Sequence, residues 1–414
     1  MGLVVAAHTT MAAYAGPILN PQYFEKSTES AGNMIFVNGG YSIQSYFLMA
    51  GWLLSYHFLL TFEKQKDARL SYVILAFFNR YIRLTPVLLI MVLLSGTWLP
   101  HFGRGPFWDR IVGMEYRNCR KNGWSNLLYI NNFYDSAHMC MQQTWYIAAD
   151  TQLFLLSLGI VMLMWKYQRR IKLILGTFLI IGILIPGIIH YVHDYDIVIR
   201  VYPEIMKNGF LDLQQWHDTY IPFYTNIGGY VIGMMFGYLF YKRRDTQYSV
   251  NKFHVVIWWF LTLGLPLGII FVGVPAYKDD YQHSRILATI YQSLARSAHA
   301  FGIGVGIFGT CKGIGWLFRD ALLWSPTQVL GRLSFCAYFG HGFVIRTRAG
   351  YLRTPLYVNF YTLLVQFIGD LAMSYIFALI LCLFVELPVA ALQRLLIPQM
   401  EEKRKQEDVK KKLK

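Results

Sequence analysis

Apolar stretches of about 20 residues recur from one end of this 414-residue chain to the other. Stretches of that length cross a lipid bilayer as helices, because a helix satisfies its own backbone hydrogen bonds where there is no water. Charged residues make up 15% of the chain, against about a quarter in soluble domains. The sequence therefore predicts an all-α protein, a polytopic transmembrane helical bundle.

We expect about ten spans in one membrane domain, because no soluble domain and no repeat of fixed period interrupts the apolar pattern. This domain covers residues 1–398, and a basic cytoplasmic tail follows at 399–414. A long polar loop is predicted at 101–141. The predicted spans are 2–18, 34–60, 84–100, 142–164, 173–192, 222–240, 253–275, 286–310, 328–347 and 360–385.

The basic residues predict the orientation. With a cytoplasmic amino terminus, the loops on that side carry 21 Lys and Arg over 68 positions, and the opposite loops carry 13 over 110. Membrane proteins concentrate Lys and Arg on the cytoplasmic side, so the net charge of +15 does not indicate nucleic acid as a partner. We expect a multi-pass protein of the plasma membrane or endoplasmic reticulum, in contact with membrane lipids, with both termini in the cytoplasm.

Two arginines, Arg80 and Arg83, precede the apolar run of the third predicted span. Their spacing puts both guanidinium groups on one face of a helix. An arginine at the bilayer centre costs about 2.5–3.5 kcal/mol, so the pair should lie at the cytoplasmic boundary. Two planar forks together suit a phosphate, although an interfacial anchor with snorkelling side chains explains the spacing equally well.

Ionisable residues inside predicted spans are functional candidates because each is costly there. His8, in the first span, suits general base work, since a neutral imidazole titrates near working pH; a histidine bonded to a neighbouring helix is the alternative. Asp150, in the fourth span, needs either a histidine to orient or an arginine to pair with. Structural pairing is the favoured account of Arg296 and Glu386, and a core histidine that of His341.

No metal site is predicted, because the chain has no His-x-x-x-His, HExxH or paired Cys-x-x-Cys pattern. The glycines at 302, 304 and 306 lie in an apolar span, where small residues permit close helix packing. Cys119 and Cys140 flank the polar loop and can form a disulfide if the loop faces an oxidising compartment.

Several short motifs follow one another in an order that a known family shares. They are His8-Thr9, Arg80-x-x-Arg83-Leu84-Thr85-Pro86, Asn126-Leu127-Leu128-Tyr129-Ile130-Asn131-Asn132-Phe133, Thr144-Trp145-Tyr146 with Asp150 and Gln152, Leu333-Ser334-Phe335-Cys336-Ala337-Tyr338 with His341, and Glu386-x-Pro388. With these motifs the whole chain resembles the membrane acyltransferase-3 superfamily, and within it the invertebrate branch named after nose resistant to fluoxetine.

The resemblance implies a ten-helix acyltransferase that uses cytoplasmic acyl-CoA and acylates a hydroxyl of a lipid or carbohydrate acceptor. It makes His8 the catalytic base and places Arg80 and Arg83 beside the coenzyme phosphates. The resemblance also implies that Asp150 and Gln44 stand at catalytic positions. The resulting picture is one tunnel that leads from a cationic cytoplasmic mouth to the buried imidazole.

Three departures from the family pattern stand against this picture. The second-span motif has an acidic residue where this chain has Gln44, and a glutamine cannot stabilise an imidazolium by charge. The branch often has an arginine where this chain has Asn226. The branch also carries a large luminal domain ahead of the region that begins here at Met1, so this chain is either a truncated product or a shortened paralogue.

Two other functions stay open beside the enzyme. The same bundle with two charges missing fits a transporter of lipids or small molecules. It also fits a catalytically degenerate member of the family. Labelled acyl-CoA turnover separates the enzyme from both alternatives, and substrate flux that is independent of His8 identifies the transporter.

Overall fold

The computed structural model describes residues 1–66, 69–206, 209–248 and 250–396, so the predicted tail at 399–414 lies outside the described residues. The described chain is helical, with one isolated β-bridge between Ile18 and Leu356. The α-helices are α1 (Gly2–Ala15), α2 (Gln22–Glu29), α3 (Met34–Val37), α4 (Gln44–Gln65), α5 (Leu70–Thr97), α6 (Met114–Leu127), α7 (Trp145–Lys166), α8 (Ile171–His193), α9 (Pro203–Met206), α10 (Ile227–Lys242), α11 (Lys252–Trp259), α12 (Leu265–Phe271), α13 (Arg285–Cys311), α14 (Trp316–Leu323), α15 (Ser325–Gly350), α16 (Phe360–Leu381) and α17 (Leu387–Leu396).

Six helical segments are long and apolar enough to cross a membrane, and a seventh qualifies if α13 and α14, bent by 78°, count as one span. The protein is therefore an integral membrane protein with an all-α fold. Helices α1, α10 and α15 occupy the other predicted stretches but are not among the six. The six segments are Gly39–Gln65, Leu70–Thr97, Gln142–Lys166, Gln168–His193, Lys252–Tyr277 and Phe360–Leu395.

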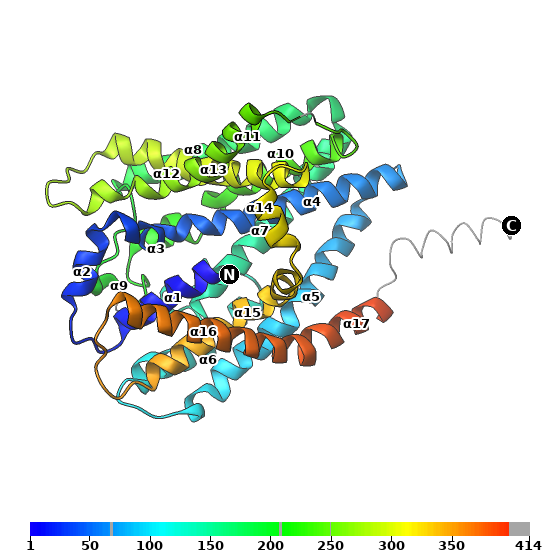
Figure 1. Cartoon of the computed structure of the whole chain (residues 1–414). Coiled ribbons are helices and arrows are strands. Elements are labelled where there is room, and N and C mark those ends of the chain that lie inside the picture. The colour runs from blue at the N-terminus through cyan, green and yellow to red at the C-terminus, as the bar shows by residue number, and fades with distance from the viewer. Residues whose placement is uncertain (67–68, 207–208, 249, 397–414) are drawn as a thin grey trace.

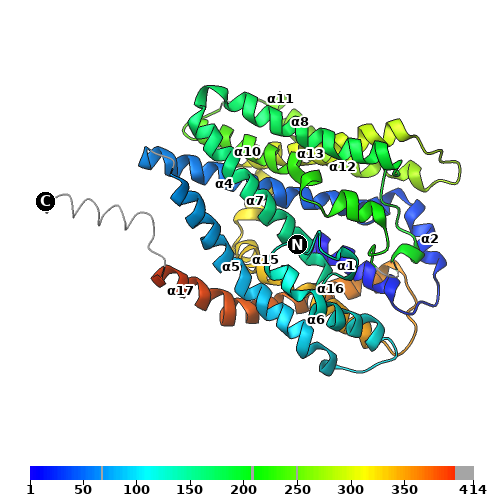
Figure 2. The same cartoon turned by 180° about the vertical axis from the view of Figure 1, so that it is seen from behind.

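Helix α1 is shorter than the span predicted at 2–18. Its 14 residues rise about 21 Å at 1.5 Å per residue, less than the hydrocarbon thickness of about 30 Å. Both views place its first residue in the middle of the bundle, with other helices around it (Figure 1 and Figure 2). His8 lies in the middle of this helix and is half-buried.

The loops gather in two groups, as the predicted alternation requires. On one side, Arg244 pairs with Glu63 at 2.8 Å and Lys312 donates to the Arg243 carbonyl, which joins the ends of α4, α10 and α13. On the other side, the backbone N–H of Leu356 donates to Pro17, and Arg285 pairs with Asp194 at 2.9 Å. These contacts agree with the predicted sidedness of the loops, although they do not identify the cytoplasmic face.

Glycines let three helices approach closely at the centre of the bundle. A Cβ at Gly51 in α4 would lie 2.2 Å from the Tyr230 carbonyl oxygen of α10, and one at Gly233 would lie 2.1 Å from that of Leu48. A Cβ at Gly304 in α13 would lie 2.4 Å from the Phe236 ring. The interpretation of the α13 glycines as packing residues is confirmed, because no side chain fits at such separations.

The region predicted as a polar loop at 101–141 is not a simple loop, because it contains α6 packed against α5. Polar residues buried by this packing bond to backbone groups of the following segment: the side-chain amide of Asn126 donates to the Cys140 carbonyl, and Glu115 accepts from the Met141 N–H. A disulfide joins Cys119 to Cys140 and ties α6 to the start of α7. Hydrophobicity alone missed α6, because it is stabilised by tertiary hydrogen bonds rather than by an apolar stripe.

Candidate functional site

The half-buried His8 contacts the buried His341, the second histidine singled out from the sequence. Its Nδ1 lies 2.8 Å from Nε2 of His341 in α15, and the two rings stack with centroids 4.9 Å apart. The Nδ1 of His341 lies 3.2 Å from the carbonyl oxygen of Ala337. The structure thus joins α1 to α15 through two imidazoles, a contact that the sequence analysis did not anticipate.

This geometry determines which nitrogen of His8 is available as a base. A carbonyl only accepts, so Nδ1 of His341 must carry the proton that faces Ala337. In the neutral ring its Nε2 is then an acceptor, and Nδ1 of His8 must donate to it. The lone pair of neutral His8 is left on Nε2. His341 therefore takes the position of the orienting group that a carboxylate holds in a serine hydrolase.

An ion pair beside His8 anchors α1, and the sequence analysis missed it. Arg348 of α15 makes a forked contact with Asp370 of α16, at 2.6 Å and 2.9 Å. The hydroxyl of Thr9 donates to the same carboxylate at 2.7 Å. Asp370 lies inside an apolar stretch of the sequence, so the rule that flags intramembrane ionisable residues would have found it.

Arg80 pairs with Asp150, which answers the question that the sequence left open about the partner of Asp150. Nη2 of Arg80 in α5 donates to Oδ2 of Asp150 in α7, and the guanidinium lies over the Phe154 ring, 4.6 Å from its centroid. Arg83 is exposed and has no ion pair among the described residues. The two arginines therefore differ: one is fixed by a carboxylate, and the other is free to bind a ligand.

The two unusual amides of this chain lie in contact with each other. The side-chain amide of Gln44 donates to the Asn226 Oδ1 at 2.6 Å, and Asn226 in turn donates to the Pro222 carbonyl at 2.7 Å. Gln44 makes no hydrogen bond to His8 within the part of the chain that the structure describes. Gln44 stands where the family pattern has an acidic residue, and Asn226 where it often has an arginine. Because the two side chains are in contact, these two departures replace one pair of opposite charges by a neutral pair.

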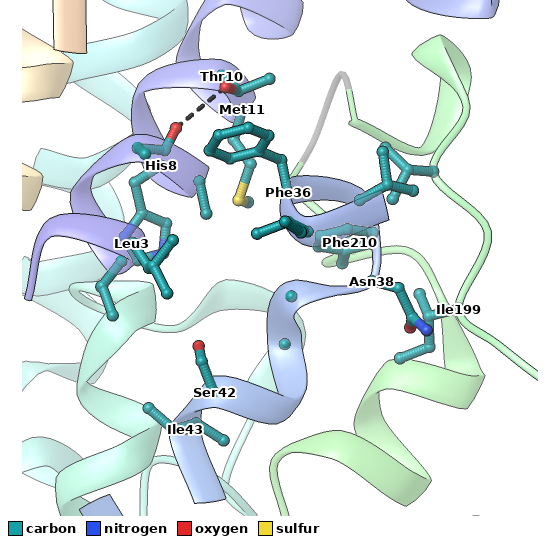
Figure 3. Close-up of a pocket in the computed structure, with 18 of the residues that line it drawn as sticks. Leu3, His8, Thr10, Met11, Phe36, Asn38, Ser42, Ile43, Ile199 and Phe210 are labelled. Carbon is teal, nitrogen blue, oxygen red and sulfur yellow. Dashed lines mark hydrogen bonds between the residues drawn. The ribbon is translucent and has the colours of Figure 1, made fainter. Parts of the chain in front are cut away.

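Two cavities hold these groups. The first, of about 610 Å³, is lined by His8, Gln44 and Arg296, and we call it the His8 cavity (Figure 3). The second, of about 710 Å³, is lined by Arg80, Arg83 and Asp150, and we call it the arginine cavity. The imidazole and the basic pair thus line two adjoining cavities, where the resemblance implied one continuous tunnel.

A thin wall separates the two cavities. Four residues line both of them: Val4, Ile43, Tyr146 and Tyr338. The rings of Tyr146 and Tyr338 meet edge to face at 5.9 Å, and the hydroxyl of Tyr338 donates to the Gln143 carbonyl. About one layer of side chains therefore separates the two cavities.

The remaining candidates separate into a cavity residue and a peripheral one. Arg296 of α13 is buried in the His8 cavity and donates to the Thr225 carbonyl at 3.0 Å. Glu386 accepts from Cys336 at 3.0 Å and lines neither cavity. Among the described residues neither Glu386 nor Arg296 forms the ion pair that the sequence analysis favoured: Glu386 accepts from a thiol, and Arg296 donates to a carbonyl.

Two groups of residues have the atom types and spacing to hold a metal ion. One comprises Glu115 with Cys119 and Cys140, but its two sulfurs are joined in the disulfide. The other comprises Cys336, Cys382 and Glu386, whose ligand atoms all lie within 4.8 Å of one another. Neither group lies on a cavity that contains His8, so no step of the chemistry below passes through them.

Comparison with known proteins agrees with the motifs. A profile of the acyltransferase-3 family, described as an acyltransferase domain, matches residues 1–387. Over 334 residues the chain is 26% identical to nose resistant to fluoxetine protein 6 of Caenorhabditis elegans. This alignment covers 75% of the chain and 39% of the worm protein, so the chain spans well under half of that relative. No solved structure matches the chain.

Proposed function

The chain belongs to the acyltransferase-3 family, and we propose that it transfers an acyl group from cytoplasmic acyl-CoA to a hydroxyl group of a lipid or carbohydrate. One observation carries this proposal. A cavity with two arginines and a cavity with an oriented histidine share a wall of four side chains. A reaction between a phosphate-bearing donor and a hydroxyl acceptor needs these two sites to be adjacent.

The arginine cavity receives the donor. Arg83, exposed and unpaired among the described residues, contacts the coenzyme phosphates, because a guanidinium binds phosphate through two parallel hydrogen bonds. Arg80 contributes positive charge from a position that Asp150 fixes. Asp150 is therefore a positioning residue rather than a base, and the thioester end of the donor passes the tyrosines of the wall.

His8 acts on the acceptor. Its Nε2 takes the hydroxyl proton while the acceptor oxygen attacks the thioester carbonyl carbon. The carbon–sulfur bond then breaks, and the coenzyme thiolate leaves and receives the proton from the imidazolium, so that an ester and free coenzyme A remain. His341 holds the His8 ring through Nδ1. Gln44 acts through Asn226 on the floor of the cavity and is not part of the proton path.

The proposed topology has ten segments in the membrane, with the amino-terminal end and the basic tail on the cytoplasmic side. The six long apolar segments, α13 with α14, and the less apolar α10 and α15 supply nine of them. Helix α1 is the tenth and reaches only part of the way across. The protein lies in the plasma membrane or the endoplasmic reticulum.

The test is acyl transfer from labelled acyl-CoA in membranes that contain wild type or His8→Ala. We expect the variant to lose about 100-fold or more of the rate, the usual share of a general base, and to bind acyl-CoA as before. His101→Ala, at an exposed position beyond α5, is the matched control. Absence of acyl-CoA binding and of product in both wild type and variant would reject the transferase.

A transporter or a catalytically degenerate protein is the second candidate, favoured by the neutral Gln44–Asn226 pair. A transporter moves its substrate without covalent chemistry, so its flux does not depend on a base. Uptake of lipid or small molecule into vesicles that His8→Ala leaves intact, without any acyl product, would identify the transporter.

A further inference from the structure

Arg296 is a buried cation without a counter-ion in the part of the chain that the structure describes. It lies in α13 with 6% of its surface exposed, and its hydrogen bond goes from Nη1 to the Thr225 carbonyl. The other N–H groups of its guanidinium have no protein acceptor among those residues. An arginine at membrane depth costs about 2.5–3.5 kcal/mol, and Arg80, by contrast, has Asp150 as its partner.

The surroundings of Arg296 supply no negative charge. The ionisable groups near it include the hydroxyls of Tyr41, Tyr220 and Tyr291 and the imidazole of His190, and none of these groups is negatively charged near pH 7. No Asp or Glu is among the described residues that line the His8 cavity. A buried charge is stable when it is paired, so the missing partner is an anion that enters this cavity.

The rest of the cavity determines what the anion is attached to. Apolar side chains of α1, of the 33–44 segment and of α16 form much of its lining, and Figure 3 shows Leu3, Met11, Phe36 and Phe210 around the space. A sugar needs many hydrogen-bond partners, whereas these walls favour a hydrocarbon chain. The combination of apolar walls and one guanidinium matches an amphiphile with an acidic head.

We propose that the His8 cavity binds an anionic lipid, an apolar chain that ends in a phosphate or carboxylate, with its head on Arg296. In the proposed function, on which this second step rests, that lipid is the acyl acceptor and its free hydroxyl lies at His8. Arg296 then determines which lipid is used, and Gln292 and Tyr220 line the same part of the cavity. Arg296 is a binding residue and takes no part in proton transfer.

The test measures binding without acyl-CoA, so that it does not depend on turnover. The purified protein in neutral-lipid nanodiscs is titrated with three probes of equal chain: oleoyl lysophosphatidic acid, oleate and uncharged monoolein. We expect at least tenfold tighter binding of the two anionic probes by wild type. Inorganic phosphate tests whether the head group alone is enough for binding. We expect that phosphate at the same concentration does not displace the anionic probes.

The variants are Arg296→Met and Arg296→Lys, with Arg285→Met, at an exposed ion pair, as the control. Arg296→Met should remove the tenfold preference and leave monoolein binding unchanged, and Arg296→Lys should restore part of it. Equal binding of charged and uncharged probes by wild type, or a preference that survives in Arg296→Met, overturns the proposal. The first of these results needs only the folded wild type, so the proposal can be overturned even if Arg296→Met fails to fold.

Failure of this inference and failure of the proposed function give different results. Arg296-dependent lipid binding with no acyl transfer rejects the transferase and keeps the anion site. Acyl transfer to an uncharged acceptor at an undiminished rate rejects the anion site and keeps the transferase.

Discussion

The two cavities differ in how their charges are balanced. In the arginine cavity, Arg80 is held by Asp150, and Arg83 is exposed at the opening. In the His8 cavity, Arg296 is buried without a carboxylate among the described residues, and the nearby Gln44–Asn226 pair is neutral. The charge of a paired arginine is already balanced by a carboxylate of the protein, whereas the charge of an unpaired arginine can be balanced by a bound anion. We therefore propose that Arg83 binds the coenzyme and that Arg296 binds an acidic head group.

One of the two largest expected effects concerns the balanced pair. Asp150→Asn leaves the charge of the half-buried Arg80 without its partner, and we expect the free energy of unfolding to fall by about 3 kcal/mol, the lower end for broken buried pairs. Thermal unfolding in detergent measures this loss. The double variant Asp150→Asn with Arg80→Met should recover most of it, and a double variant as unstable as the single one would mean that the pair is not the cause.

The neutral Gln44–Asn226 pair should lose stability when a single charge is added to it. Gln44→Asp places a carboxylate where 1% of the side chain is exposed, and we expect a loss of about 3 kcal/mol, limited by protonation of the new acid. Adding Asn226→Arg should restore stability, since the two positions are in contact. Turnover measured in this double variant then tests degeneration, because a gain in rate indicates descent from an active enzyme.

Arg83 should matter for the donor and not for lipid binding. We expect Arg83→Met to weaken acyl-CoA binding about tenfold, which is about 1.4 kcal/mol, while the anionic probes bind as before. Arg296→Met should give the reverse result. Equilibrium binding of labelled acyl-CoA and of labelled oleate to the same preparations measures both. If either variant weakened both ligands equally, the two arginines would serve one site.

The smallest expected effect lies in the wall between the cavities. Tyr338→Phe removes the hydrogen bond to the Gln143 carbonyl, and we expect a loss of about 1 kcal/mol. Tyr146→Phe is the matched control, because its hydroxyl has no hydrogen bond in the described part of the chain. The two variants are compared by thermal unfolding. Equal stability of both would show that the hydroxyl of Tyr338 does not hold the wall.

The membrane class and the family could be read from the sequence, since apolar length and ordered motifs carry both. From the sequence, the partner of Asp150 could be limited to two residue types, a histidine or an arginine. A buried carboxylate needs a cation or a histidine, but the choice depends on how α5 lies against α7. The disulfide was foreseen as an option and is present.

Other parts of the site could not be predicted, because they depend on helices that are remote in the sequence. His8 and His341 are 333 positions apart, and their contact fixes a tautomer that neither motif encodes. The four side chains shared by the cavities come from α1, α7, α15 and the turn before α4, so a linear pattern could not show that they meet. Asp370 could have been predicted, because it is an ionisable residue inside an apolar stretch, as His8 is.

The side chains shared by the two cavities have one more consequence. Val4, Ile43, Tyr146 and Tyr338 line both cavities, so in the proposed function an acyl chain that passes from one cavity to the other moves between these four side chains. The apolar surface of such a chain packs against them and keeps the layer dry. A small hydrated molecule on the same path would carry water between apolar side chains, which is costly.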